Sequence, residues 1–135
     1  ASGLGILLEQ GIGDTMRISL TDDPVEEIRA CWTLLSALGL RRRDPELVSC
    51  PTCGRCQVDL IAIAKEVEDK LKHIHRPLQV AVMGCVVNGP GEAADADIGV
   101  ACGKGSGVIF AQGKTLRKVE EAAIVDALME EIGRL

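Results

Sequence analysis

Aromatic side chains are almost absent from this sequence, which has one tryptophan, one phenylalanine and no tyrosine among 135 residues. Such a chain offers few aromatic faces on which nucleobases could stack. Its net charge is −5, so it also lacks the positive excess of a nucleic-acid-binding surface. The one basic run, Arg41 to Arg43, follows a predicted helix and is interpreted as the solvated end of that helix. Nucleic-acid binding is therefore excluded as the main function.

Long apolar runs are absent as well. No stretch of the sequence is long enough to span a bilayer. The N-terminal segment ASGLGILLEQ lacks the basic start and the cleavage pattern of a secretory signal. We therefore expect a cytoplasmic protein that binds no membrane. In a reducing compartment, closely spaced cysteines more often bind metals or take part in catalysis than form structural disulfides.

The composition that is present favours a folded α/β protein. A hydrophobic fraction of 47% over 135 residues is enough for a core of ordinary domain size. One helix is predicted to begin at an N-cap, Asp22 or Asp23, followed by Pro24, and to end at Gly39. Apolar residues at steps of three and four predict a second helix from Gln57 and a third from near Arg117.

Strands are predicted between these helices, and an earlier helix closes near ILLEQGIG. The predicted strands are TMRISL, ELVSC, LQVAVMG, ADIGVACG and GVIFAQG, the last two joined by a hairpin at KGS. Asp44-Pro45 is a turn signal and a plausible domain boundary. Alternating helices and strands predict an α/β fold with parallel pairing.

Four of the six cysteines lie in two loops that follow predicted strands. SCPTCGRC, residues 49–56, holds Cys50, Cys53 and Cys56 at a spacing of three, and MGCVVNGPGE, residues 83–92, holds Cys85. The ends of strands are where α/β folds commonly place their ligands. Because thiolates bind soft iron and zinc, the two loops predict a metal site.

Spacing alone leaves the ligand set open. Cys50, Cys53 and Cys56 resemble the cysteine run of bacterial ferredoxins, but no fourth cysteine with a following proline completes it. A zinc ribbon would need a second C-x-x-C pair, which the sequence lacks. Cys31, inside a predicted helix, and Cys102, near a strand end, are interpreted as small buried hydrophobic residues.

The segment NGPGE adds a carboxylate to the second loop. Its two glycines and proline let a backbone approach a bulky ligand closely, and Asn88 tolerates unusual backbone angles. A structural turn with an exposed Glu92 would also explain the segment. Beside Cys85, however, Glu92 would be a harder and more weakly held iron ligand than a thiolate, and could keep one iron open to a substrate oxygen.

The two cysteine motifs, with GIGDTMRISL and DPVEEI upstream in the same order, resemble the C-terminal part of the 4-hydroxy-3-methylbut-2-enyl diphosphate synthases. The resemblance covers essentially the whole chain. It implies that residues 46–135 form an iron–sulfur domain, a small sheet flanked by helices as in sulfite reductases. It also implies that residues 1–43 are a strand–helix remnant of an N-terminal (β/α)8 barrel.

The resemblance further implies a site for a 4Fe–4S cluster. Carried over residue by residue, the ligands are Cys50, Cys53 and Cys85, with Glu92 as the fourth. Cys56 matches no ligand of that family and is interpreted as a bystander at the start of a helix.

Substrate contacts are implied for three residues besides Glu92. Asn88 matches a residue near the substrate, so Asn88 and Glu92 are expected to be the catalytic residues. Arg17 and Ser19 match barrel residues that hold the substrate's diphosphate. An arginine at the end of a barrel strand is where phosphate recognition is expected in any case, although Arg17 as a plain surface charge stays an alternative.

The function implied is that of an iron–sulfur oxidoreductase of the methylerythritol phosphate route to isoprenoids. It would open the ring of 2-C-methyl-D-erythritol 2,4-cyclodiphosphate reductively to 4-hydroxy-3-methylbut-2-enyl diphosphate, with electrons from ferredoxin or flavodoxin. The full-length protein is expected to be a homodimer, and this chain a fragment that is inactive alone. Two alternatives stay open: an electron-transfer module with a cluster on Cys50, Cys53, Cys56 and Cys85, or a structural zinc domain.

Overall fold

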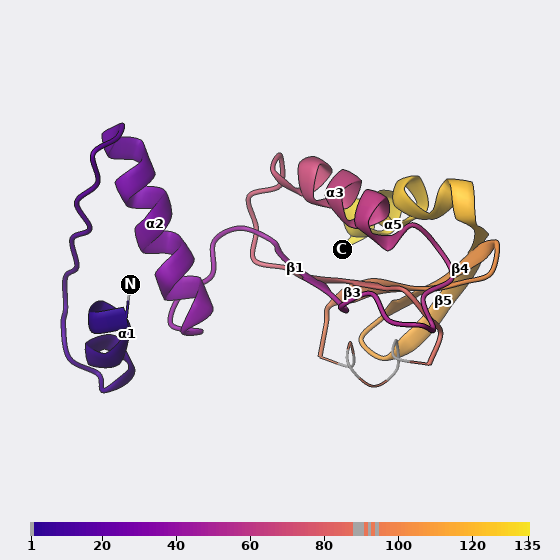
Figure 1. Ribbon diagram of the computed structural model, residues 1–135, viewed down its shortest axis with the longest axis horizontal. Coiled ribbons are helices and arrows are strands. Elements are labelled where there is room, and N and C mark those ends of the chain that lie inside the picture. Colours follow the sequence, from indigo (N-terminus) through magenta and orange to yellow (C-terminus); the bar gives the residue numbers. More distant parts are fainter. Residues whose placement is uncertain (1, 88–90, 92, 94) are drawn as a thin grey trace. The chain divides into compact units, whose positions relative to one another are not determined.

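The computed structural model describes residues 2–87, 91, 93 and 95–135 (Figure 1). The chain divides into two compact units, Ala1–Arg43 and Asp44–Leu135. Each unit has its own secondary structure.

The first unit contains two helices, α1 (Ser2–Glu9) and α2 (Pro24–Ala37). The Asp23 carboxylate accepts a hydrogen bond from the backbone N–H of Val25, 2.9 Å away, so Asp23 is the N-cap. Proline at the first helical position and glutamates in the first turn complete the start of α2. Gly39, with a φ of 66°, follows the helix end.

The predicted strand TMRISL is wrong, because residues 15–20 form neither helix nor strand. A β-strand needs a neighbour to accept and donate its backbone hydrogen bonds, and the described part of this unit contains no strand. At the end of the segment, the backbone N–H of Leu20 donates to Glu27 instead, at 2.9 Å. On α2, the apolar side chains of Val25 and Ile28 are exposed.

The second unit is built on a sheet whose described strands follow the order β1-β2-β3-β4-β5. These strands are β1 (Glu46–Ser49), β2 (Gln79–Met83), β3 (Ile98–Gly103), β4 (Ser106–Ala111) and β5 (Lys114–Glu120). β1, β2 and β3 pair in parallel, whereas β3, β4 and β5 are antiparallel. The sheet is therefore mixed, with parallel pairing confined to its first half.

Two helices, α3 (Leu60–Leu71) and α5 (Ile124–Arg134), lie on the same face of this sheet (Figure 1). The predicted α/β class, with a small sheet flanked by helices, is confirmed. None of the described helices has the length and apolar character needed to cross a membrane.

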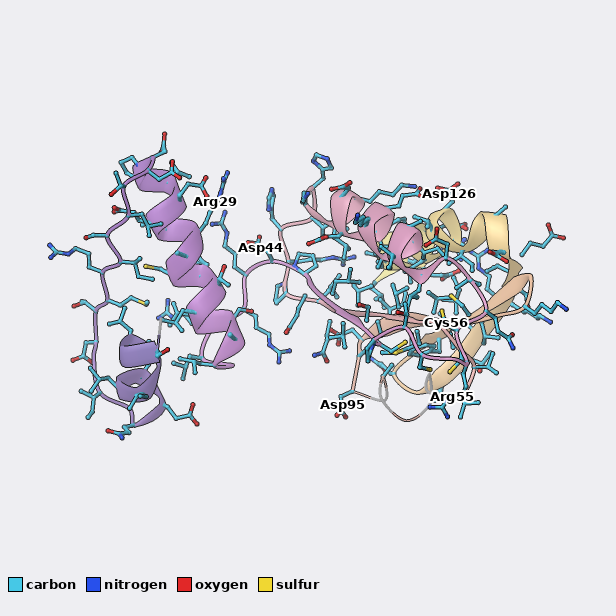
Figure 2. The ribbon with its side chains drawn as sticks, viewed as in Figure 1. Arg29, Asp44, Arg55, Cys56, Asp95 and Asp126 are labelled. Carbon is cyan, nitrogen blue, oxygen red and sulfur yellow. The ribbon has the colours of Figure 1, made fainter. Side chains whose placement is uncertain are left out.

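The core lies between the sheet and these helices. The central strands β2 and β3 are buried almost throughout, as expected for strands with a neighbour on each side. The helices contribute apolar residues at spacings of four and seven, which place them on one face: Leu60, Val67, Leu71, Ile124, Leu128 and Ile132. Figure 2 shows side chains in the space between these two helices and the sheet.

The last helix was predicted to begin near Arg117, which is wrong because α5 begins at Ile124 and residues 114–120 form β5. Most β5 side chains are exposed, so the strand has little apolar alternation to reveal it. The available signal was the dipeptide between β4 and β5. Gln112 and Gly113 both have positive φ, 48° and 74°, which is the geometry of a two-residue hairpin turn.

The buried position of Leu128 gives a test of this core. Leu128 is fully buried, whereas Leu116 on β5 is 48% exposed. We expect Leu128→Ala to lower the free energy of unfolding by about 2–5 kcal/mol, because it leaves a cavity. Leu116→Ala should lower it by less than about 1 kcal/mol. Urea unfolding followed by circular dichroism measures both; equal losses would contradict the assigned core.

Candidate functional site

Both cysteine loops begin at the same edge of the sheet. Cys50 is the first residue after β1, and Cys85 follows the end of β2 by two residues. β1 and β2 pair in parallel, with Ser49 opposite Val82. Since parallel strands point the same way, the two loops leave the sheet side by side, at the edge where α/β folds bind ligands.

Gly84 joins the two loops through its backbone. Its N–H donates a hydrogen bond to the Cys50 Sγ at 3.3 Å. Its carbonyl accepts one from the N–H of Gln57, also at 3.3 Å. The segment from Cys50 to Gln57 is thus fixed at both ends to the end of β2. Within it, the N–H of Cys56 donates to the carbonyl of Cys53 at 2.9 Å, which closes a turn.

All six cysteines are free thiols, but their surroundings differ. Cys50 and Cys85 are buried, whereas Cys53 is exposed. Hydrogen bonds from the Arg55 backbone and side chain lower the pKa of the Cys53 thiol below its ordinary value. A lowered pKa raises the thiolate fraction, and the thiolate is the form that binds metals. Figure 2 shows Arg55 and Cys56 at the same end of the sheet.

Cys102 lies fully buried in β3, where a small hydrophobic residue is expected. Burial raises the pKa of its thiol to about 12, with further contributions from nearby Cys56, Glu121 and Cys50. Cys102 is therefore protonated at neutral pH and is a poor metal ligand. Cys31 lies elsewhere, half-buried on α2 in the first unit.

The predicted ligand set is only partly within the described structure. Asn88 and Glu92 lie outside the described residues. Among those described, no three His, Cys, Asp or Glu side chains form a group that could hold a metal ion. The donor chemistry nonetheless fits a thiophilic metal, because Cys50, Cys53 and Cys85 are free thiols on two loops joined at Gly84. The ligand roles of these residues stay predictions.

An open groove of about 440 Å³ borders the first loop. Its lining comes from β1, the loop after it and α3, and includes Cys50, Pro51, Lys65 and Glu68. One side of Cys50 is thus close to a surface depression, although its own side chain is buried.

The predicted diphosphate-binding residues belong to the other unit. Arg17 and Ser19 are exposed, and both lie in the segment 15–20 that has no regular structure. Their contact with a substrate stays a prediction.

Gly84 ends the predicted strand LQVAVMG, but its contacts with the first loop are not evident from the sequence. A glycine between a buried strand and a cysteine is a signal for close approach of another segment. The segment that approaches is set by the pairing of β1 with β2, which no local pattern specifies.

Comparison with known families gives two matches along the chain. The family model described as GcpE protein C-terminal domain matches residues 46–134. The model described as GcpE TIM-barrel domain matches residues 1–32. The first match alone covers well over half of the chain.

Curated proteins with high similarity carry one common name, 4-hydroxy-3-methylbut-2-en-1-yl diphosphate synthase (flavodoxin). The protein from Lawsonia intracellularis is 57% identical over 98% of this chain and 37% of its own length. That from Geobacter sulfurreducens is 58% identical over 100% of this chain and 38% of its own length. The protein from Aquifex aeolicus is 58% identical over 96% of this chain and 36% of its own length. The chain therefore spans little more than a third of the relatives it matches.

Thiol labelling tests the described environments. In the metal-free folded chain, we expect iodoacetamide to modify Cys53 first, because it is exposed and its lowered pKa leaves more thiolate at neutral pH. The rate for Cys102 should be lower by a factor of about one hundred or more, since this thiol is buried and protonated. Mass spectrometry of peptides over time measures both rates. Unfolding the chain in urea should make the rates similar; rapid labelling of Cys102 in the folded chain would contradict the structure.

Proposed function

The chain belongs to the GcpE protein family, and on this premise we propose that it is the cluster-binding portion of a 4-hydroxy-3-methylbut-2-enyl diphosphate synthase. The whole protein would open the ring of 2-C-methyl-D-erythritol 2,4-cyclodiphosphate by reduction, within isoprenoid biosynthesis. The observation that carries the proposal is identity of 57–58% across almost the entire chain to relatives of that name. The two cysteine loops joined at Gly84 supply chemistry that suits it.

We propose that Cys50, Cys53 and Cys85 hold a 4Fe–4S cluster, with Glu92 as the fourth ligand. When bound, such a cluster supplies electrons and Lewis acidity. The protein's contribution is local. Burial of Cys50 and Cys85 limits access of water to two of the sulfurs. The Gly84 N–H donates to the Cys50 sulfur, and hydrogen bonds from Arg55 favour the thiolate of Cys53.

The substrate-facing roles are proposed for residues of both units. Arg17 would donate hydrogen bonds to the diphosphate, because guanidinium matches phosphate oxygens in charge and shape. Ser19 would add a hydroxyl donor beside it, and Asn88 an amide near the reacting carbon. Glu92 would act at the cluster and the substrate together.

Partners and place in the cell follow from the same proposal. The relatives' printed name includes flavodoxin, which supports flavodoxin, or the comparable carrier ferredoxin, as electron donor. We propose a cytoplasmic protein whose full-length form is a homodimer.

Replacing single cysteines tests the ligand set. We expect Cys50→Ser, Cys53→Ser and Cys85→Ser each to lose most of the cluster after anaerobic reconstitution, because a serine oxygen binds iron more weakly than thiolate. Cys31→Ser and Cys102→Ser should retain it, since neither belongs to the two loops. Iron and sulfide per chain, with the visible spectrum, are the measurements.

Two further results, one on the parent chain and one on the variants Glu92→Ala and Cys56→Ser, would contradict the proposal. One is zinc in place of iron in protein purified without air. The other is a Glu92→Ala variant whose cluster content and reduction potential match the parent while Cys56→Ser loses the cluster. That second pattern would favour an electron-transfer module with four cysteine ligands.

The isolated chain is expected to show no turnover of the cyclodiphosphate, even with a reconstituted cluster and excess reductant. Arg17 and Ser19 are few groups with which to hold a diphosphate, and correct positioning can contribute about 7–11 kcal/mol to a reaction barrier. An anaerobic assay that separates substrate from product measures this, with the full-length Geobacter sulfurreducens relative as positive control. Turnover by the chain near that of the control would contradict the proposal.

A further inference from the structure

Gly84 is enclosed on the side where a side chain would lie. A Cβ added there would be 2.7 Å from the Cys56 Sγ and 3.2 Å from Leu60 Cδ2. The first distance is far below an ordinary contact between non-bonded atoms. Together with the hydrogen bonds to Cys50 and from Gln57, this leaves Gly84 in contact with the first loop on several sides.

Cys56 is the residue that fills this space. Its side chain is half-buried and packs against the core. Its thiol lies 3.3 Å from the Val58 carbonyl and donates a hydrogen bond to it. The Cys56 sulfur is thus already engaged with the protein, between the loop and the strand end.

We infer that Gly84 and Cys56 form a packed joint that fixes the distance between the Cys50 loop and Cys85. Cys56 acts in it as a spacer, not as a ligand, and Gly84 is a positioning residue. The inference rests on the proposed function, because the distance matters for a cluster shared by the two loops.

The joint depends on the space that Gly84 leaves and on the direction of its N–H. Ligand loops hold a metal well only when neighbouring groups fix their orientation. Here the Gly84 N–H fixes the Cys50 sulfur, and the absence of a Cβ lets the Cys56 sulfur seat against residue 84. An added methyl group would push the loop away from the strand end. The hydrogen bond to Cys50 would lengthen, and the ligand thiols would separate.

Four variants of the chain test the joint: Gly84→Ala, Cys56→Ala, the double variant, and Gly54→Ala. Gly54 is a matched control, because it lies in the same loop and a Cβ there meets nothing within 4 Å. The measurements are iron and sulfide per chain after anaerobic reconstitution, the reduction potential of the loaded fraction, and the unfolding temperature of the metal-free chain.

We expect Gly84→Ala to reduce cluster content about tenfold. Its remaining clusters should have a more negative potential, because the hydrogen bond to the Cys50 sulfur is weakened. Cys56→Ala should keep cluster content close to that of the parent. The double variant should recover most of what Gly84→Ala loses, since removing the sulfur makes room for the added methyl group. Gly54→Ala should match the parent.

Several outcomes would contradict the inference that Gly84 and Cys56 form this joint. Loss of the cluster in Cys56→Ala would indicate that Cys56 is a ligand. If the double variant did not recover cluster content, the contact between residue 84 and the Cys56 sulfur would not be the cause of the loss in Gly84→Ala. An unchanged potential in Gly84→Ala would reduce Gly84 to a structural role. Should the parent chain bind no cluster, the proposed function fails, while the joint still predicts that Gly84→Ala lowers the unfolding temperature and the double variant restores it.

Discussion

Parallel pairing of β1 with β2 is the constraint on which the site depends. Because the strands run the same way with Ser49 opposite Val82, both cysteine loops leave the sheet at one edge. An antiparallel pair would have placed them at opposite ends. Parallel strands need a crossover connection, and α3 provides it. The 29 residues between β1 and β2 therefore serve both the fold and the first loop.

The core and the site share atoms at this edge. Leu60 is buried in the core and begins α3, and its Cδ2 also approaches the position of a Cβ on Gly84. Cys56 likewise packs against the core while touching the strand end. Interiors are close-packed, so a displacement of α3 is transmitted to its neighbours. The stability of the second unit and the geometry of the cysteine loops are consequently coupled. A substitution at Leu60 would change both.

Much of this fold follows from local patterns in the sequence. Asp23 and Pro24 specify the start of α2, and short apolar runs specify β1 to β4. The two wrong predictions, a strand at residues 15–20 and a helix in place of β5, share a cause: whether a segment forms a strand depends on a neighbouring strand. Residues 15–20 alternate like a strand but have no neighbouring strand in the described part of their unit, whereas β5 lacks the alternation yet forms because β4 pairs with it. The cysteine spacing predicted a two-loop site, but the contacts of Gly84 depend on tertiary pairing and could not be predicted.

The residues proposed for the two parts of the chemistry are divided between the two units. The thiols of Cys50, Cys53 and Cys85 belong to the unit with the sheet, and Arg17 and Ser19 to the other. The thiol loops rest on strands with a continuous core of their own, so their geometry is set by packing within residues 44–135. Arg17 and Ser19 lie on a segment without regular structure, where little within the unit fixes them. On the proposed function, metal binding is therefore a property of one unit, whereas substrate positioning depends on protein beyond it.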